Sequence, residues 1–120
     1  MGLSAMRRAL GTWGFAVVRG RSMQPTLYDG DRLLVRHGAT PREGDLVVVR
    51  LPGRGVAVKR AAFRTEGGWW VERDNPAEGT DSWLVGAVPE ADVLAVARLR
   101  LRLGTRPSLR RVGGRGSRPR

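Results

Sequence analysis

Short apolar runs, rich in valine and leucine and separated by turn residues, recur along most of the chain. Glycine and aspartate, which tolerate the positive φ of tight turns, stand between the runs. Near the end of this region arginine and leucine alternate, as in a strand with one dry and one wet face. The pattern predicts a mainly β, single small domain of antiparallel strands. We expect strands over residues 12–18, 32–36, 46–51, 56–63, 69–73, 83–88 and 93–103.

Both ends of the chain differ from this pattern. Residues 1–11 lie before the first strand and are compatible with a short helix over 3–10. Residues 104–120 are dominated by glycine, arginine, proline and serine, and such a segment buries too little surface to offset its ordering entropy. We therefore expect an N-terminal segment at 1–11, a β-domain at 12–103 and a disordered, arginine-rich tail at 104–120.

The length of the apolar runs and the absence of cysteine bear on location. The unbroken apolar runs are short, with four residues at 15–18 and at 46–49, whereas a membrane span needs about 20. No apolar signal-peptide core follows Arg7 and Arg8. The chain has no cysteine and hence no disulfide framework. These features predict a cytoplasmic protein with no membrane span.

The charge is uneven along the chain. The net charge of +11 first suggests a nucleic-acid partner. Residues 93–120, however, hold nine arginines and no acidic residue, so most of the excess charge lies in or near the expected tail. A solubilising tail is the preferred interpretation. Non-specific binding of nucleic acid, or of an acidic partner, is the alternative.

The segment 20–27 contains a serine that could act as a nucleophile. Ser22 follows the first expected strand, and Pro25 stiffens the loop by fixing its own φ and driving Gln24 toward an extended conformation. A serine at a strand exit in a stiff loop is well placed to attack a substrate. The alternative is a turn serine that caps nearby backbone.

Lysine is much rarer than arginine in this chain. Lys59 is the single lysine among 22 basic residues, and it lies in the apolar strand expected over 56–63. An ordinary lysine, with a pKa of about 10.4, is neutral in roughly one molecule in 2,500 at pH 7. Burial lowers that pKa, whereas arginine stays protonated. Lys59 could therefore serve as a base for Ser22, the alternative being a lysine left by chance in an arginine-biased composition.

Other types of site have little support. There is no glycine-rich phosphate loop, and one histidine without cysteine predicts no metal site and no cofactor. His37 falls in a polar turn, where a surface role is expected. The four tryptophans are expected to pack in the core and on the strands, rather than to stack on nucleic-acid bases: Trp13, Trp69, Trp70 and Trp83.

Four motifs in order resemble those of the type I signal peptidase family. They lie at 20–27, 44–50, 58–60 and 73–82, and the resemblance covers roughly two thirds of the chain. The same Ser–Lys pairing and β fold occur in the self-cleaving repressor peptidases. The small size and the lack of a membrane anchor are most similar to the soluble branch that matures nickel-type superoxide dismutase.

The resemblance implies a role for each matching residue. Ser22 is the nucleophile and also donates its backbone N–H to the oxyanion, and Lys59 is the general base. The substrate is held as an added extended strand. The residues expected beside the oxyanion and the substrate are Gly20, Met23 and Pro25. Those expected to support the loop near the pair are Asp74, Asn75, Thr80, Asp81 and Ser82.

Four positions depart from the family pattern. Gly20 replaces a hydroxyl residue that often assists the oxyanion, and Gly79 replaces a serine that often contacts the lysine. Arg73 replaces the glycine that usually precedes the Asp-Asn pair in the motif at 73–82. Trp83 replaces an arginine, which predicts that Asp81 lacks its usual ion partner. The second oxyanion donor and the lysine's further contact thus stay open.

The expected function is a serine endopeptidase that removes an N-terminal extension from a specific precursor, for which nickel superoxide dismutase is the example. Two alternatives remain. One is a self-cleaving regulator, which is disfavoured because no N-terminal DNA-binding domain and no Ala-Gly or Cys-Gly bond is present. The other is a non-catalytic β-domain that binds peptide or nucleic acid.

Overall fold

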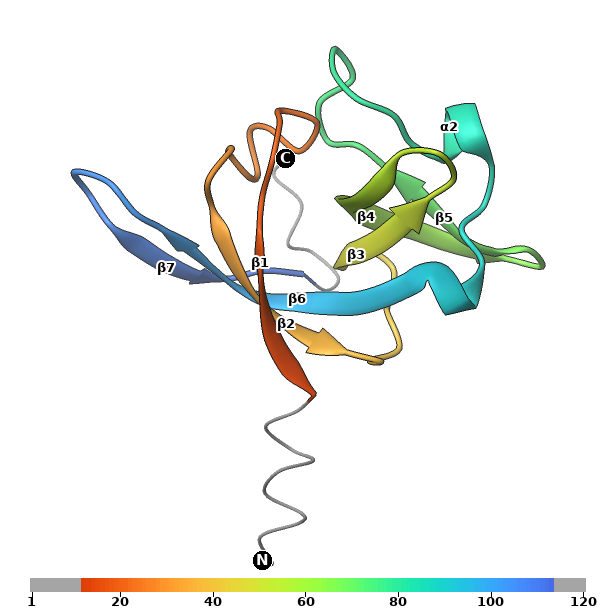
Figure 1. The fold of residues 1–120 in the computed structure, drawn as a ribbon, viewed down its shortest axis with the longest axis horizontal. Helices are drawn as coiled ribbons and strands as arrows, with labels where there is room; N and C mark the ends of the chain where they lie inside the picture. The colour runs from red at the N-terminus through yellow and green to blue at the C-terminus, as the bar shows by residue number, and fades with distance from the viewer. Residues whose placement is uncertain (1–11, 114–120) are drawn as a thin grey trace, which may run out of the picture.

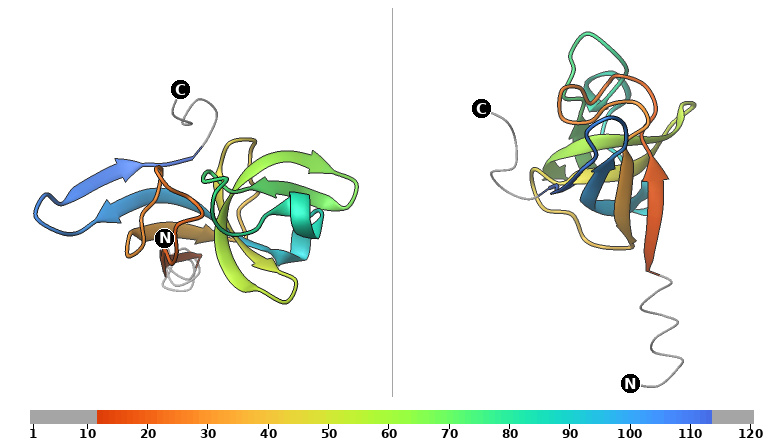
Figure 2. Two further views of the ribbon diagram at one scale, coloured as in Figure 1. Left: turned by 90° about the horizontal axis from the view of Figure 1, so that it is seen from above. Right: turned by 90° about the vertical axis from the view of Figure 1, so that its left-hand side faces the viewer.

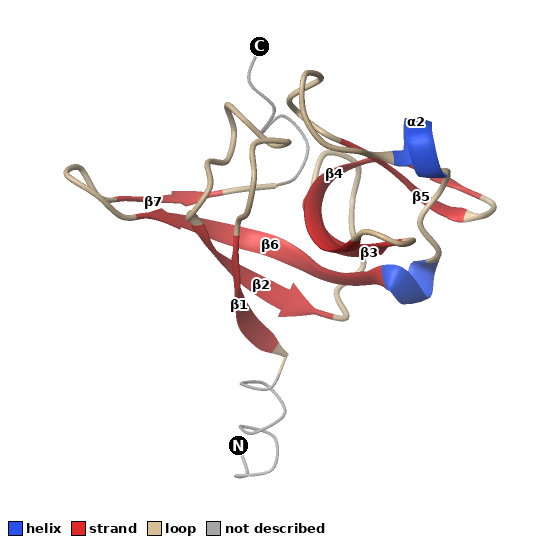
Figure 3. Ribbon diagram, turned by 45° about the horizontal axis from the view of Figure 1, so that its top comes forward, coloured by secondary structure: helices blue, strands red, loops and turns tan. Residues whose placement is uncertain are grey.

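A computed structural model describes residues 12–113, and this part of the chain is a single antiparallel sheet with two short helical turns (Figures 1 and 3). The prediction of a mainly β domain is confirmed. The elements in order are β1 Trp13–Val17, β2 Arg32–His37, β3 Leu46–Leu51, β4 Gly55–Thr65, β5 Gly68–Glu72, α2 Ser82–Val85, the 3₁₀ turn Glu90–Asp92, β6 Val93–Arg102 and β7 Ser108–Arg111.

The long strand β6 organises the sheet. The strand order is β1-β2-β6-β3-β4-β5, and β7 also pairs with β6. One edge of β6 pairs with β2 along most of its length. The other edge is shared, because residues 93–96 pair with β3 and residues 99–102 pair with β7. The sheet thus divides at β6 into a β1-β2 side and a β3-β4-β5 side, as Figure 1 shows.

The strand β3 is buried on both faces. Leu46 and Val48 belong to one apolar cluster, which also takes in Met23 and Leu27 from the loop after β1. Val47 and Val49, whose side chains alternate with these, belong to a second cluster. Two cores on opposite faces of one strand explain why residues 46–49 are an unbroken apolar run rather than an alternating pattern.

The strand predicted over 83–88 is wrong. Ser82–Val85 forms one helical turn, α2, because Asp81 caps it and accepts a hydrogen bond from the Trp83 amide at 3.1 Å. Gly86, at φ 83°, ends the turn. Only Val88 in this segment pairs as expected of a strand residue, through a bridge to Trp69.

The prediction of disorder from residue 104 onward is wrong for residues 108–111. They form β7, which turns back on β6 and brings Leu109 opposite Leu101. Val112 then packs against the first core cluster. Backbone pairing with an existing strand edge, together with one anchored valine, orders a segment whose composition alone favours disorder.

Some predictions lie outside the described residues. These are the N-terminal segment at 1–11 with its short helix, and the last part of the expected tail, 114–120. Among the helices of residues 12–113, none has the length and apolar character that crossing a membrane requires.

Because β3 is buried on both faces, the stability of the fold should be most sensitive to substitutions in this strand. Leu46→Ala removes a fully buried side chain and should destabilise the protein by about 2–5 kcal/mol, since the cavity cannot fully collapse. Leu109→Ala, the same change at a 63% exposed position, should cost less than about 0.5 kcal/mol. Urea unfolding followed by circular dichroism measures both, and equal losses would contradict the assignment of β3 as the centre of the core.

Candidate functional site

Ser22 lies in the loop between β1 and β2. This loop is drawn in orange in the upper part of Figure 1. The loop is anchored from inside, because Met23 and Leu27 are both buried in the first core cluster. The Leu27 amide donates to the Met23 carbonyl at 2.9 Å, which closes the turn. Ser22 itself is half-buried and stands between this anchored turn and the strand β1.

Lys59 approaches Ser22 from β4. Its side chain is only 3% exposed, and its Nζ donates a hydrogen bond to Ser22 Oγ at 2.7 Å. Burial lowers the pKa of Lys59 below its ordinary value of 10.5, because a buried ammonium loses its hydration. The carboxylate of Asp81 raises that pKa and the guanidinium of Arg73 lowers it further. The structure therefore brings together the two residues that the sequence singled out.

The next residue, Arg60, points to the other face of β4 and forms a buried ion pair. Its Nη2 lies 2.6 Å from Asp74 Oδ2, and its Nε donates to Asp74 Oδ1 at 3.2 Å. Thr26 Oγ1 also donates to Asp74, at 2.6 Å. Asp74 thus ties β4 to the Ser22 loop.

The segment 73–82, which joins β5 to α2, packs directly on the Ser22 loop. The Asn75 amide donates to the Ser22 carbonyl at 2.8 Å, and Asn75 Nδ2 donates to the Arg21 carbonyl at 2.9 Å. The Asp74 amide contacts Met23 Sδ at 3.4 Å. The two loops stand side by side in the right-hand view of Figure 2. Asp74, Asn75 and Met23 therefore hold the serine loop in place.

Gly79 lies against the Ser–Lys pair. Its φ is +83°, a conformation that L side chains rarely adopt. A Cβ at this position would lie 2.6 Å from Ser22 Cβ and 3.6 Å from Lys59 Nζ. The backbone at position 79 lies too close to Ser22 for any side chain. This explains why glycine stands here in place of the serine of the family pattern.

Asp81 has an ion partner, contrary to the prediction from Trp83. Arg73 Nε lies 3.8 Å from Asp81 Oδ2, and the Arg73 amide donates to the same oxygen at 3.2 Å. Arg73 also donates to the Gly79 carbonyl. The arginine missing at position 83 is thus replaced in space by the arginine at position 73. Two departures from the family pattern compensate for each other.

The remaining predicted support residues differ in their roles. Ser82 Oγ accepts a hydrogen bond from the Val71 amide at 2.8 Å and so attaches α2 to β5. Thr80 is buried beside Asp81, and its Oγ1 has no hydrogen-bond partner among residues 12–113. Pro25 is exposed and lies away from the pair, on the rim of a neighbouring cavity.

The backbone amides of Gly20 and Ser22, two residues expected beside the oxyanion, differ in their hydrogen bonding. The Gly20 amide donates to Asp29 Oδ1 at 2.8 Å, so it is already engaged. The Ser22 amide makes no hydrogen bond within the described part of the chain. The structure therefore leaves the Ser22 amide available to a substrate oxygen.

A small apolar cavity of about 110 Å³ opens beside Ser22. It lies between β1 and the first residues of β4. Its lining is mostly aliphatic and consists of Ala16, Val17, Val18, Arg19, Ser22, Met23, Val48, Val56, Ala57 and Val58. Such a cavity accepts a small apolar side chain.

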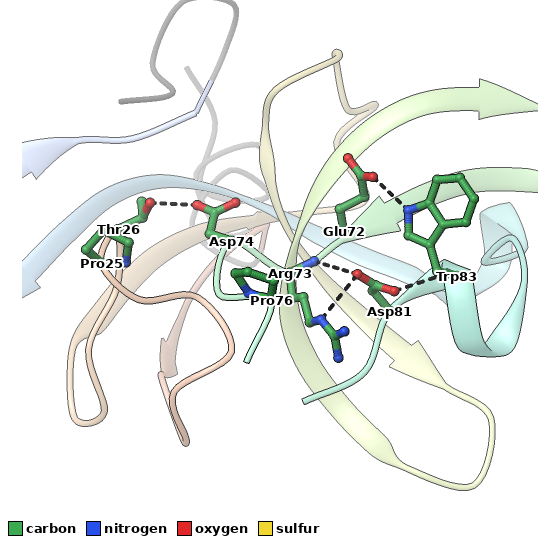
Figure 4. Close-up of a pocket in the computed structure, with 8 residues that line it drawn as sticks. All are labelled: Pro25, Thr26, Glu72, Arg73, Asp74, Pro76, Asp81 and Trp83. Carbon is green, nitrogen blue, oxygen red and sulfur yellow. Dashed lines mark hydrogen bonds and ion pairs between the residues drawn. The ribbon is translucent and has the colours of Figure 1, made fainter. Parts of the chain in front are cut away.

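A second cavity, of about 580 Å³, lies behind the 73–82 segment and does not include Ser22 or Lys59 (Figure 4). Its polar side chains are already engaged with one another: Thr26 with Asp74, Arg73 with Asp81, and Trp83 with Glu72. Trp83 itself is 71% exposed and stacks edge-on against Trp70, so the expectation that it packs in the core is wrong. The polar groups that line this cavity therefore hold the 73–82 segment in place and are not free to bind a ligand.

Two residues at the site, Arg60 and Thr26, have contacts that the local sequence does not reveal. Arg60 follows Lys59 in the sequence, but alternation along β4 places it on the opposite, equally buried face. Thr26 gave no signal, because its partner Asp74 lies 48 residues away. No cluster of three or more histidine, cysteine, aspartate or glutamate side chains suited to a metal occurs in residues 12–113, and His37 is exposed at the end of β2.

Comparison with known proteins gives a family and no individual relative. Neither the search of curated proteins nor that of solved structures returned a match. The model of the Peptidase S24-like family matches residues 5–86, which is more than half of the chain and includes both Ser22 and Lys59. This agrees at family level with the signal-peptidase-like resemblance of the sequence and supports a serine peptidase. The chain therefore belongs to the Peptidase S24-like family.

Proposed function

We propose that the protein is a serine endopeptidase in which Ser22 and Lys59 form a catalytic dyad. The observation that carries the proposal is the 2.7 Å contact between Lys59 Nζ and Ser22 Oγ, made by a lysine that is almost fully buried. A buried lysine with a lowered pKa can accept a proton near neutral pH, which an exposed lysine rarely does.

The geometry supports the following sequence of steps. Neutral Lys59 Nζ takes the proton of Ser22 Oγ while that oxygen attacks the substrate carbonyl carbon. The Ser22 amide stabilises the resulting oxyanion. The Lys59 ammonium then protonates the amine nitrogen as the C–N bond breaks. A water molecule then attacks the acyl carbon and gives a proton to Lys59. The ester bond to Ser22 Oγ breaks, and the Lys59 ammonium returns the proton to that oxygen.

The strands beside the dyad suit an extended substrate. β1 pairs only with β2, and residues 55–59 of β4 pair only with β3, so each has an edge without a strand partner in the described structure. A peptide added along these edges would present alternate side chains to the small apolar cavity. We infer a preference for a small apolar side chain next to the cut bond.

The substrate is proposed from the sequence resemblance. A precursor with a short N-terminal extension, such as that of nickel superoxide dismutase, is the first candidate. Mass spectrometry of the precursor after incubation identifies the cut bond. The same spectra report the mass of the peptidase itself, so self-cleavage is distinguished from cleavage of another chain.

Removing either member of the dyad should abolish processing. Ser22→Ala removes the nucleophile, and Lys59→Met replaces the base with an apolar side chain of similar length that suits a buried position. We expect kcat/KM to fall roughly 100- to 10,000-fold for Lys59→Met, the usual contribution of a general base. Circular dichroism checks that both variants are folded. A folded Lys59→Met variant that cuts at the wild-type rate would sink the proposal.

The lowered pKa of Lys59 predicts a pH dependence of both activity and stability. Only neutral Lys59 accepts the serine proton, so kcat/KM should rise with pH through an ionisation below 10.5. Between the lowered pKa and 10.5 the unfolded chain binds more protons than the folded one, so the free energy of unfolding rises with pH. Compared with Lys59→Met, the wild type should therefore gain stability in that window. A difference that stays constant with pH would contradict a buried, titrating lysine.

The close approach of Gly79 predicts a steric test with a matched control. Gly79→Ala places a Cβ 2.6 Å from Ser22 Cβ, so either Ser22 or the 79 backbone must shift. We expect this to disturb the contact between Ser22 and Lys59 and to lower kcat about 100-fold. Gly86 has the same φ of +83°, but a Cβ there meets nothing within 4 Å. Gly86→Ala should therefore lose similar stability and keep its activity. Equal activity losses in the two variants would show that backbone strain, and not contact with Ser22, is responsible.

A further inference from the structure

A cavity lined by arginines lies where the edge of β6 passes from β3 to β7. Its volume is about 330 Å³, within the range of small-ligand sites. Residues from β3, β4, β6 and β7 contribute to it. Its arginines are Arg60, Arg100, Arg102, Arg110 and Arg111. Neither Ser22 nor Lys59 lines it, so whatever it binds is separate from the proposed dyad.

Two of these arginines have carboxylate partners. Arg60 pairs with Asp74, and Arg102 donates to both oxygens of Asp31 at 2.9 and 2.8 Å. The other three, Arg100, Arg110 and Arg111, form no ion pair within residues 12–113. The cavity therefore holds three arginines that no carboxylate of the described residues contacts, although the Asp31 carboxylate acts on Arg100 from further away.

Of these three arginines, only Arg100 is buried, so its charge carries the largest desolvation cost. It is only 4% exposed, and its side chain makes one hydrogen bond to the described residues, from Nη2 to Ser108 Oγ at 2.8 Å. Its Nε is buried and has no hydrogen-bond partner among the described residues. Burial lowers the pKa of Arg100, and Arg102 and Arg110 lower it further, while Asp31 raises it. Buried charged donors are normally paired, because an unpaired one loses its hydration without compensation.

The strand register adds a second, independent observation. Arg100 lies directly opposite Arg110 in the β6-β7 pair, so both side chains project from the same face. Like charges directly opposite each other destabilise a strand pair. An anion between the two guanidinium groups would remove this repulsion and give the Arg100 Nε an acceptor.

We propose that this cavity binds a phosphate group through Arg100 and Arg110. The guanidinium fork matches the oxygens of phosphate, and the charge of a phosphate monoester or diphosphate suits several unpaired arginines better than the single charge of a carboxylate. The phosphate comes from a small phosphorylated ligand or from the backbone of a nucleic acid.

Isothermal titration of the full chain with pyrophosphate, at an ionic strength held constant with sodium chloride, tests the proposal. We expect saturable binding at one site per chain. Arg110→Gln, at an exposed position, should weaken binding about tenfold or more, as should Arg100→Gln if that variant folds. Arg54→Gln makes the same change in the exposed turn between β3 and β4, outside the cavity, and should bind like the wild type.

The results distinguish the two sources of the phosphate from each other and from the absence of a phosphate site. Competition by a short single-stranded oligonucleotide assigns the phosphate to a nucleic acid, and its absence assigns it to a small ligand. No saturable binding, or equal weakening by Arg110→Gln and Arg54→Gln, overturns the proposal, because the contacts are then those of a basic surface. Ser22→Ala should bind pyrophosphate normally, so this result does not depend on the peptidase activity.

Discussion

The buried ion pair between Arg60 and Asp74 holds together the three segments that form the site. Arg60 comes from β4, Asp74 from the segment after β5, and Thr26, which also bonds Asp74, from the loop that carries Ser22. Burying two charges is costly, and the pair is stable only when its remaining polar atoms are satisfied. Here Arg60 Nη1 donates to the Gly44 carbonyl at 2.8 Å. The pair thus fixes the position of the Ser22 loop relative to β4, and therefore relative to Lys59.

The charges that act on Lys59 also come from the segment that contains Asp74. Asp74 is paired with Arg60, and the carboxylate that acts on Lys59 is that of Asp81, which tends to keep the lysine charged. Arg73 opposes this effect, since it lies between Asp81 and the Gly79 carbonyl and lowers the pKa of Lys59. The substitution of arginine for glycine at position 73 therefore provides both an ion partner for Asp81 and a bias toward neutral Lys59.

Local sequence predicts this fold well where a strand is supported by its own pattern. β2, β3 and β6 are long, apolar or alternating, and bounded by turn residues. Prediction from the local sequence fails where the conformation depends on a side chain or strand edge outside the segment. The apolar residues at 83–88 favour a strand, but the side chain of Asp81 caps a helical turn. The arginine-rich segment 108–111 becomes a strand because β6 offers a free edge. In the same way, Ser22 and Lys59 were accessible to chemical reasoning, whereas the contacts of Thr26, Gly79 and Arg73 depend on chain segments brought together only by the fold.

Lys59 and Arg100 show why the balance of arginine over lysine matters physically. Both side chains are almost completely buried, and burial lowers the pKa of each. A lysine can respond by releasing its proton, after which the neutral amine is tolerated and can act as a base. An arginine keeps its proton at any pH at which the protein functions, so its buried charge must be met by an anion. In a chain with a single lysine, the residue able to become neutral lies against a serine, while the buried arginine without a carboxylate lies in a cavity large enough for an anion. Burial of a cationic side chain therefore predicts a base at Lys59 and an anion-binding group at Arg100.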